Sequence, residues 1–129
     1  MPHIFTTRVY YEDTDLAGIV YYANYLKFIE RARTEFVREM GIDQVALRDE
    51  AGIVFAVHKV EAEYLAPARF QDDLTVETRI DNVSGARLVL GQDVLRGDEL
   101  LFRSTVTLVV LTAAGRPTRL PADIRRRLT

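Results

Sequence analysis

Three carboxylates, Glu12, Asp13 and Asp15, stand within four positions of the stretch YYEDTDLAGIVYYANY, residues 10–25. Aspartates before a helix are common caps and turn formers, and Gly18 can simply supply a permissive backbone. The same pattern also suits chemistry. The first N–H groups of a helix are unpaired and can polarise a carbonyl oxygen, while a nearby carboxylate attacks that carbonyl or activates water. The spacing therefore leaves two interpretations open, a helix cap and an acyl-transfer site.

The sequence lacks the residues that several other enzyme classes need. The sequence contains no GxGxxG, GxxxxGK or GxSxG motif, and its two serines, Ser84 and Ser104, sit in no nucleophile elbow. The two histidines have no second metal ligand at a recognisable spacing, so we expect no metal site. We expect His3 at the surface and His58 in a structural role within a strand. Cysteine is absent, which excludes disulfides and suits a reducing compartment.

The residues around the acidic stretch predict a strand, a loop and a long helix. The segment IFTTRVYY, residues 4–11, alternates as a half-buried strand does. Between residues 22 and 40 the period becomes helical, and Gly41 is a natural stop. The apolar stripe of this helix consists of Tyr25, Ile29, Ala32, Phe36 and Met40.

The rest of the chain is predicted to be mostly strand. Asp43 can cap a short helix over 44–51 that ends at Gly52. Four apolar, alternating segments follow, separated by LAPARFQDD, NVSG and GD. The two shortest gaps suit hairpins, so we expect the segments to form an antiparallel meander. These segments are 53–64, 74–81, 86–96 and 99–111, and a short helix over 120–128 closes the chain.

Together these elements predict one α+β domain spanning residues 1–129, with a curved antiparallel sheet of about five strands wrapped around the long helix. An edge strand would remain, and a second copy could cover it, so we expect a homo-oligomer. No apolar run reaches about 18 residues and no leader is evident, so we expect a cytoplasmic protein without a membrane span.

The formal charge of −2 is unevenly distributed. Residues 113–129 carry a net +4, which leaves −6 for the remainder. This basic end is either a solvated face or a surface for an anionic ligand. Since no basic stripe alternates with aromatics, we do not expect a nucleic acid partner.

Two stretches, RVYYEDTDLAGIVYYANYLKFIERARTEF and EYLAPARFQDDLTVET, resemble the 4-hydroxybenzoyl-CoA thioesterase family of hotdog-fold enzymes. They are most similar to its branch of YbgC-type acyl-CoA thioesterases associated with the Tol-Pal system. The resemblance implies a hotdog fold, assembled as a dimer or homotetramer. It also implies hydrolysis of an acyl-CoA or acyl carrier protein thioester without a cofactor.

By the same resemblance Asp15 occupies the catalytic carboxylate position, and either nucleophilic attack or general-base catalysis remains open. Tyr22 occupies the position whose backbone amide, at the helix start, faces the thioester carbonyl. Gly18 lets the chain turn between them. We take Asp13 as structural and Glu12 as solvated.

The coenzyme A phosphates need cationic or N–H partners. The resemblance points to the segments NVSGAR and GRPTRLP, with Ser84, Arg87 and Arg119 as candidates and Arg116 as a weaker one. Because hotdog sites lie between subunits, these residues need not share a chain with Asp15.

Three alternatives remain. One is a non-catalytic hotdog protein that binds acyl carriers or envelope partners, and another is a plain interaction domain. A dehydratase shares the fold, but its histidine-containing motif is absent. The acyl preference is open, although Leu16, Val57 and Tyr64 could shape the pocket.

Overall fold

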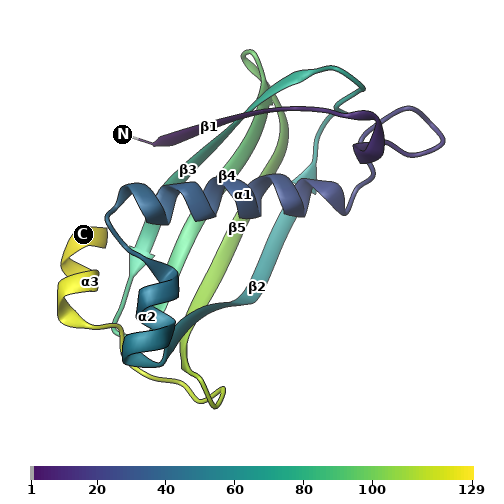
Figure 1. Ribbon diagram of the computed structural model, residues 1–129. Coiled ribbons are helices and arrows are strands. Elements are labelled where there is room, and N and C mark those ends of the chain that lie inside the picture. Colours follow the sequence, from purple (N-terminus) through teal and green to yellow (C-terminus); the bar gives the residue numbers. More distant parts are fainter. Residues whose placement is uncertain (1) are drawn as a thin grey trace.

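The computed structural model describes residues 2–129. These residues form a mixed α+β chain with most of its strands after the first two helices (Figure 1). In chain order the elements are β1 (His3–Arg8), the 3-10 turn η1 (Tyr11–Asp13), α1 (Asn24–Glu39), α2 (Gln44–Ala51), β2 (Ile53–Tyr64), β3 (Asp73–Val83), β4 (Arg87–Arg96), β5 (Glu99–Thr112) and α3 (Ala122–Leu128).

The five strands form one sheet in the order β1-β3-β4-β5-β2, and every neighbouring pair is antiparallel. The sheet curves, and α1 lies across its concave face (Figure 1). The predicted architecture, a curved five-stranded sheet around one long helix, is confirmed. The two short helices predicted over 44–51 and 120–128 are present as α2 and α3, at the end of the sheet where α1 finishes.

The predicted meander is wrong for β2. This strand pairs with β5, from Ile53↔Thr112 to Tyr64↔Phe102, and so occupies an edge instead of the place beside β3. The gaps NVSG and GD form hairpins as expected, but the connection over 65–72 is too long to do so. It carries the chain across one end of the sheet, from the β2 edge to β3, and this crossing becomes part of the candidate site.

The predicted apolar stripe of α1 is buried except for Met40, which follows the last helical residue and is partly buried. Tyr25, Ile29, Ala32 and Phe36 are all at least nine-tenths buried, and Phe28 is wholly inaccessible. Fully burying one such aromatic or aliphatic side chain stabilises the fold by about 1.5–3 kcal/mol. Opposite them the concave face of the sheet presents its own buried side chains, among them Val76, Leu90, Val94 and Val106.

A buried polar link also fixes α1 over the sheet. The amide Nε2 of Gln92, on β4, donates to the carbonyl of Ile29 at 2.8 Å and to Oγ1 of Thr78 at 3.0 Å. Its Oε1 accepts from Arg33 Nη1 at 3.0 Å, and burial lowers the pKa of that arginine. A buried polar group is costly unless it is hydrogen-bonded, so this network specifies the register of helix on sheet.

Two predicted boundaries shift at the acidic stretch. β1 ends at Arg8 instead of residue 11, because the Tyr10 amide donates to the carboxylate of Asp13 and turns the chain into η1. α1 begins at Asn24 instead of residue 22, because residues 21–23 form a turn. At its other end the helix stops as predicted, with Gly41 at φ +81°.

The helix α2 begins and ends at its predicted caps. Asp43 Oδ1 accepts the Ala46 amide at 3.0 Å, and Gly52 closes α2 at φ +66°. In α3, Ile124 and Leu128 are buried. Among residues 2–129, no helix has the length and apolar character that crossing a bilayer requires.

Candidate active site

The acidic loop is a tight hairpin-like turn with Asp15 near its tip. Thr14 and Val20 pair across its base, the Asp15 amide donates to Ile19 O at 2.9 Å, and the Gly18 amide donates to Asp15 O at 3.0 Å. Gly18 has φ +78°, the left-handed conformation that favours glycine, which fits the turning role expected for it. Asp15 is exposed, and its Oδ1 accepts the Ala17 amide at 2.9 Å. No residue among 2–129 donates to its other carboxylate oxygen, Oδ2.

Asp13 and Glu12 differ from Asp15 in their surroundings. Asp13 is 7% exposed, and its Oδ2 accepts the Tyr10 amide at 2.8 Å. The Asp13 carbonyl accepts two further bonds, from the Tyr21 amide and from Asn24 Nδ2, both at 2.9 Å. Asp13 therefore binds the acidic loop to the start of α1, while Glu12 is exposed.

Asp15 lies at a cleft of about 390 Å³ whose lining is mainly apolar and aromatic. The side chains come from the acidic loop, the start of α1, the end of β2 and the crossing segment. They are Asp15, Ile19, Val20, Tyr21, Tyr22, Tyr25, Tyr64, Leu65, Ala66 and Pro67. The cleft thus brings together Asp15 and Tyr22, two of the residues predicted to act together, beside a surface that suits an acyl group.

The turn before α1 contains unpaired backbone donors. Tyr21 O accepts the Asn24 amide at 2.8 Å, which closes the turn around Tyr22 and Ala23. Within the described chain, the amides of Tyr22 and Ala23 have no acceptor. Tyr22 thus lies two residues before the first helical residue instead of inside the helix, but its N–H remains free at the positive end of the helix dipole.

The wall opposite the acidic loop is the crossing segment. Ile19 pairs with Arg69, the Val20 amide donates to Ala68 O at 2.9 Å, and the Ala68 amide donates to the Tyr25 hydroxyl at 3.0 Å. Burial raises the pKa of Tyr25, so this phenol is neutral at physiological pH. These contacts place the acidic loop and the cleft wall in one hydrogen-bonded unit.

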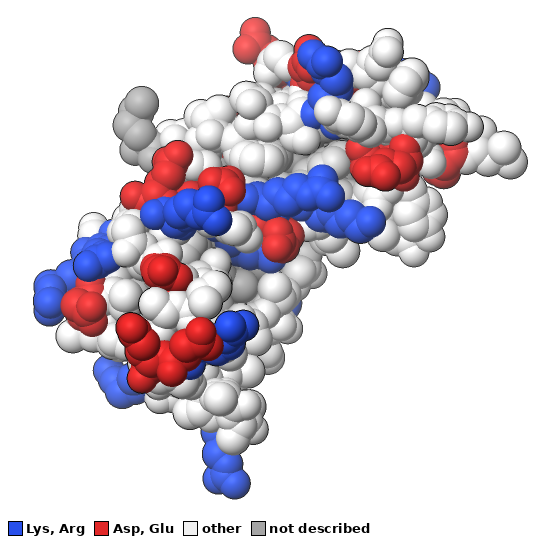
Figure 2. Space-filling view, viewed as in Figure 1, with Lys and Arg blue, Asp and Glu red and all other residues white. Residues whose placement is uncertain are grey.

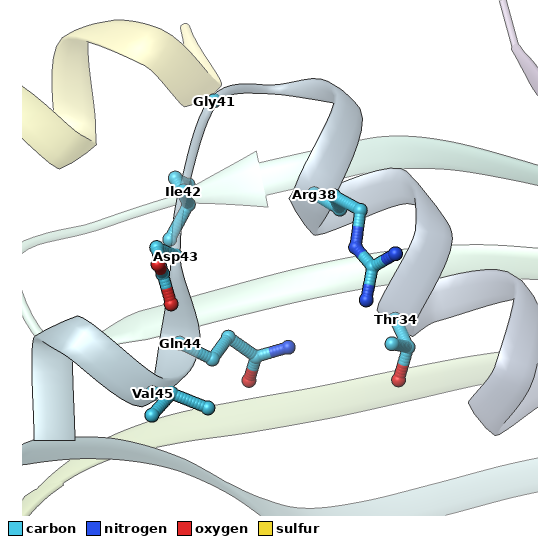
Figure 3. A pocket seen from close by; sticks show the side chains of 7 residues that line it. All are labelled: Thr34, Arg38, Gly41, Ile42, Asp43, Gln44 and Val45. Atoms are coloured by element: carbon cyan, nitrogen blue, oxygen red, sulfur yellow. The ribbon is translucent and has the colours of Figure 1, made fainter.

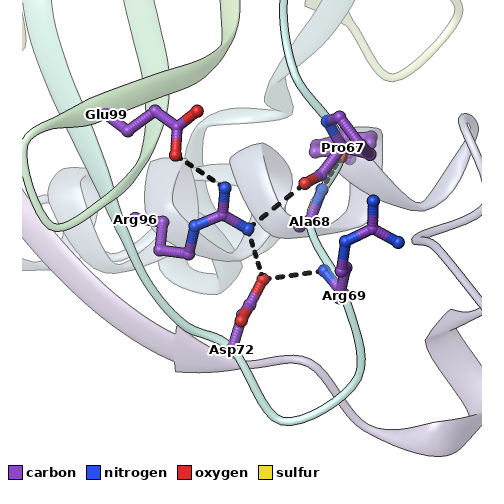
Figure 4. Close-up of polar contacts among 7 residues, drawn as sticks. Pro67, Ala68, Arg69, Asp72, Arg96 and Glu99 are labelled. Atoms are coloured by element: carbon purple, nitrogen blue, oxygen red, sulfur yellow. Dashed lines mark hydrogen bonds and ion pairs between the residues drawn. The ribbon is translucent and has the colours of Figure 1, made fainter.

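An ion-pair network holds that wall to the β4–β5 hairpin (Figure 4). Arg96 Nη1 lies 2.7 Å from Asp72 Oδ2 and 3.3 Å from Pro67 O, and its Nη2 lies 2.6 Å from Glu99 Oε1. Asp72 Oδ2 also accepts the Arg69 amide at 2.8 Å. Burial alone would raise the pKa of Asp72, but the Arg69 amide and the Arg96 guanidinium together lower it.

Sequence reasoning missed this network and the hydroxyl of Tyr25. Asp72 stands just before a strand, where turn-forming aspartates are common, but no local pattern pairs it with Arg96, 24 residues further on. Tyr25 belongs to the predicted apolar stripe, and that pattern does not show that its hydroxyl binds the Ala68 amide.

The tyrosines at the mouth of the cleft also influence one another. The rings of Tyr21 and Tyr22 have centroids 4.9 Å apart. The Tyr22 phenol and, to a smaller degree, the charge of Asp15 raise the pKa of Tyr21. The Tyr21 hydroxyl is therefore protonated at neutral pH.

The residues predicted to bind coenzyme A gather elsewhere. Ser84 Oγ accepts the Arg87 amide at 3.2 Å, and the Arg119 guanidinium lies over Gly85, so close that a Cβ there would be 2.7 Å from Nη2. Arg116 O accepts the Thr112 amide at 2.7 Å in the turn after β5.

These four residues lie at the opposite end of the sheet from Asp15. β3 begins beside the cleft wall at Asp73 and ends at Val83, and its 11 residues span about 35 Å. Figure 2 shows acidic side chains over the loop between β1 and α1, and a basic side chain at the far tip, over the loop after β5. Within one chain, therefore, the structure does not bring these candidates to Asp15.

A larger hollow, about 720 Å³, lies between the end of α1 and the start of α2 (Figure 3). Its lining consists of Thr34, Arg38, Gly41, Ile42, Asp43, Gln44 and Val45. The one carboxylate there, on Asp43, already caps α2 through the Ala46 amide. The lining of the hollow contains no aromatic side chain, so it offers an acyl group a less suitable surface than the smaller cleft does.

Neither histidine lies in the cleft. His58 is exposed at the irregularity of β2 between Val57 and Lys59. The surface location predicted for His3 is wrong, because its side chain is 9% exposed, with Nε2 3.1 Å from Glu39 Oε2 and the ring edge-on to Phe36. Across residues 2–129, no three His, Cys, Asp or Glu side chains are grouped closely enough to hold a metal ion.

Comparisons with known proteins all identify thioesterases as relatives of this chain. The model of the thioesterase-like superfamily matches residues 9–128. The acyl-CoA thioesterase YbgC of Haemophilus influenzae is 37% identical over 122 residues, which cover 94% of this chain and 90% of the relative. The acyl-CoA thioester hydrolase YbgC of Escherichia coli O6:H1 is 42% identical over 119 residues, covering 91% and 88%.

Solved structures agree. A probable thioesterase from Bartonella henselae superposes with a TM-score of 0.88 at 37% identity, covering 94% of this chain and all of the other. A 4-hydroxybenzoyl-CoA thioesterase variant, crystallised with 4-hydroxybenzoyl-CoA, superposes with a TM-score of 0.91 at 25% identity, covering 99% of each chain. The resemblance found in the sequence is confirmed: this chain belongs to the thioesterase-like superfamily of hotdog-fold enzymes, in the branch of the YbgC-type acyl-CoA thioesterases.

Proposed function

We propose that the protein hydrolyses an acyl-CoA thioester to a free acid and coenzyme A, in the cleft beside Asp15. The observation that carries this proposal is the placement of a carboxylate with an unpaired oxygen and the unpaired Tyr22 amide at one apolar cleft. The YbgC relatives support the reaction type. Asp15, Tyr22 and Gly18 keep the roles that the sequence predicts for them.

In the proposed mechanism, the thioester carbonyl oxygen accepts the Tyr22 amide, and the acyl group lies among the aromatic side chains. Asp15 then follows one of two routes. As nucleophile it forms a C–O bond to the acyl carbon while the C–S bond breaks, and water hydrolyses the resulting anhydride. As general base it takes a proton from the water that attacks. In both routes the thiolate of coenzyme A leaves and is protonated, and no cofactor is needed.

The free amides stabilise the transition state in this scheme. Negative charge grows on the carbonyl oxygen during attack, and a preorganised donor aimed at that oxygen contributes about 10²–10³ in rate. Both routes use a carboxylate oxygen of Asp15, either as the nucleophile or as the proton acceptor.

We further propose that two copies form the working unit. The exposed edge of β2, which includes Val57 and Val60, would pair antiparallel with the same edge of a second copy. Antiparallel pairing places the Tyr64 end of one β2 beside the Ile53 end of the other. The Ala113 amide donates to Gly52 O, so the basic turn after β5 lies at that second end.

This arrangement moves the coenzyme A candidates of one copy toward Asp15 of the other. Arg119, Arg87 and Ser84 would bind the phosphates, with Arg116 in a lesser role. An acyl carrier protein thioester remains an alternative substrate, and the cytoplasm remains the expected location.

The test is a panel of acyl-CoA and acyl carrier protein thioesters, with release of free thiol as the measurement. We expect the native protein to hydrolyse at least one of them. Asp15→Asn should lose about 10²–10⁴ in kcat with little change in stability. Glu12→Gln, an exposed neighbour, is the matched control and should retain full activity.

The outcomes separate the alternatives. A native protein that hydrolyses none of the thioesters would favour the non-catalytic alternative, in which the fold binds acyl carriers or envelope partners. Full activity in Asp15→Asn would instead move the chemistry to another residue. A single turnover in ¹⁸O-labelled water that leaves label in the Asp15 carboxylate would show nucleophilic attack.

A further inference from the structure

Tyr64 makes a long-range contact with the turn that carries the free amides. It is the last residue of β2, and its hydroxyl donates to the carbonyl oxygen of Tyr22 at 2.9 Å, across 42 residues of sequence. The carbonyl of Tyr22 and the amide of Ala23 belong to one planar peptide group. A bond that holds this oxygen therefore holds the direction of the Ala23 N–H as well.

The neighbouring peptide group is held in the same way. Tyr21 O accepts the Asn24 amide at 2.8 Å, and this bond orients the Tyr22 N–H. The two consecutive peptide groups thus have their oxygens bound and their N–H groups free. A hydrogen bond to a peptide oxygen also polarises the N–H of the same group and makes it a stronger donor.

The dihedral angles of Ala23 show where its amide points. Its φ of −72° and ψ of −19° are helical, although the hydrogen-bonded helix starts only at the next residue. The N–H groups of a first helical turn point away from the helix body, toward its N-terminal side. The Ala23 amide is therefore a second free donor at the end of α1 that faces the acidic loop.

The ring of Tyr64 is fixed well enough to hold the bond. It packs edge-on against Phe102, with centroids 5.0 Å apart, and against Tyr25 at 5.5 Å. The chain directly after it is anchored, because the amides of Leu65 and Ala66 both donate to Leu101 O. Burial raises the pKa of Tyr64, so its hydroxyl stays protonated as a donor at neutral pH.

We propose that Tyr64 is a positioning residue: by donating its hydroxyl to the Tyr22 carbonyl, it aligns the Ala23 amide as a second oxyanion donor beside the Tyr22 amide. This inference rests on the proposed hydrolase function. It gives Tyr64 a role beyond shaping the acyl pocket, and it makes the edge strand β2 part of the catalytic geometry.

The first test uses Tyr64→Phe without substrate. This variant keeps the ring and its packing and removes only the hydroxyl. We expect the ¹³C resonance of the Tyr22 carbonyl to move upfield and the Ala23 amide resonance to shift, while the melting temperature changes little. A Tyr22 carbonyl resonance that does not move would overturn the proposal, whatever the activity of the protein.

The second test is kinetic. Tyr64→Phe should lower kcat about fivefold with KM nearly unchanged, because the lost alignment acts on the transition state. The loss should be equal for a short aliphatic and an aromatic acyl-CoA, since backbone donors contact the thioester oxygen and not the acyl chain. Tyr11→Phe, an exposed tyrosine outside the cleft, is the control and should match the native protein.

The outcomes distinguish the proposed hydrolase function from the positioning role of Tyr64. An inactive native protein would overturn the proposed function. An active native protein whose Tyr64→Phe variant has full kcat, or loses activity on only one acyl group, would overturn the positioning role and leave the proposed function standing.

Discussion

Arg96 lies 2.7 Å from Asp72, and this ion pair fixes the wall of the cleft that faces the acidic loop. The bound Asp72 carboxylate also accepts the Arg69 amide, and Arg69 pairs with Ile19 in the acidic loop. The position of Asp15 therefore depends on two residues that lie outside the cleft itself.

Asp72→Asn should destabilise the protein in a pH-dependent way. The pKa of Asp72 lies below its ordinary value of 3.8, so the native state binds its proton more weakly than the unfolded chain does. The stabilisation is fully present above pH 3.8 and is lost as the pH falls through the lowered pKa. At pH 7 we expect the variant to lose about 1 kcal/mol of unfolding free energy, and the difference should shrink below pH 3.8.

Denaturant unfolding across that pH range measures the effect. Asp73→Asn is a matched control, because Asp73 forms an exposed pair with Arg8 that contributes little in water. Equal losses in the two variants would contradict the special role of the Arg96–Asp72 pair.

Substitution of Asp13 should lower stability, whereas substitution of Asp15 should lower activity. Asp13→Ala leaves the Tyr10 amide without its acceptor, so the unfolding free energy should fall by about 1–2 kcal/mol. Asp15→Asn should leave the melting temperature almost unchanged and abolish most of the activity. Thermal melts and thiol-release rates on the same samples compare the two. A stable, fully active Asp13→Ala variant would show that the loop does not need this bond.

Arg119→Ala should weaken binding of the nucleotide end of the substrate. We expect KM for an acyl-CoA to rise about tenfold, as for a lost charge-assisted hydrogen bond. The same acyl group on pantetheine carries no nucleotide, so its KM should not change. Arg126→Ala, an exposed arginine on α3, is the control. Equal effects on both substrates would argue against a phosphate contact.

Val60→Lys should break the proposed pairing of β2 edges. Val60 is 40% exposed near the middle of this edge strand, and a lysine there would place like charges together in the interface. We expect sedimentation velocity to show a shift toward the monomer, with a fall in activity. Val45→Lys, a change at a more exposed valine on α2, should leave both unaltered. A native protein that is already monomeric and active would contradict the two-copy site.

The sequence predicts the local elements well because their causes are local. The helical stripe from Tyr25 to Phe36, the stop at Gly41 and the Asp43 cap each depend on residues within a few positions of one another. The predicted boundaries near Tyr10 and Tyr22 are wrong, since these boundaries depend on hydrogen bonds that Asp13 accepts and that periodicity does not show.

What the sequence determined by itself is the class of the fold, the family, and the short stretch in which Asp15, Gly18 and Tyr22 stand together. Only the tertiary structure decided that β2 lies beside β5, because strand order depends on which apolar faces can be buried together and not on chain order. That choice brings Tyr64 to the Tyr22 carbonyl and sends the crossing segment past Asp15. The arginine candidates lie at the far end of the sheet because the β3–β4 hairpin is there, and only a second copy would bring them near Asp15.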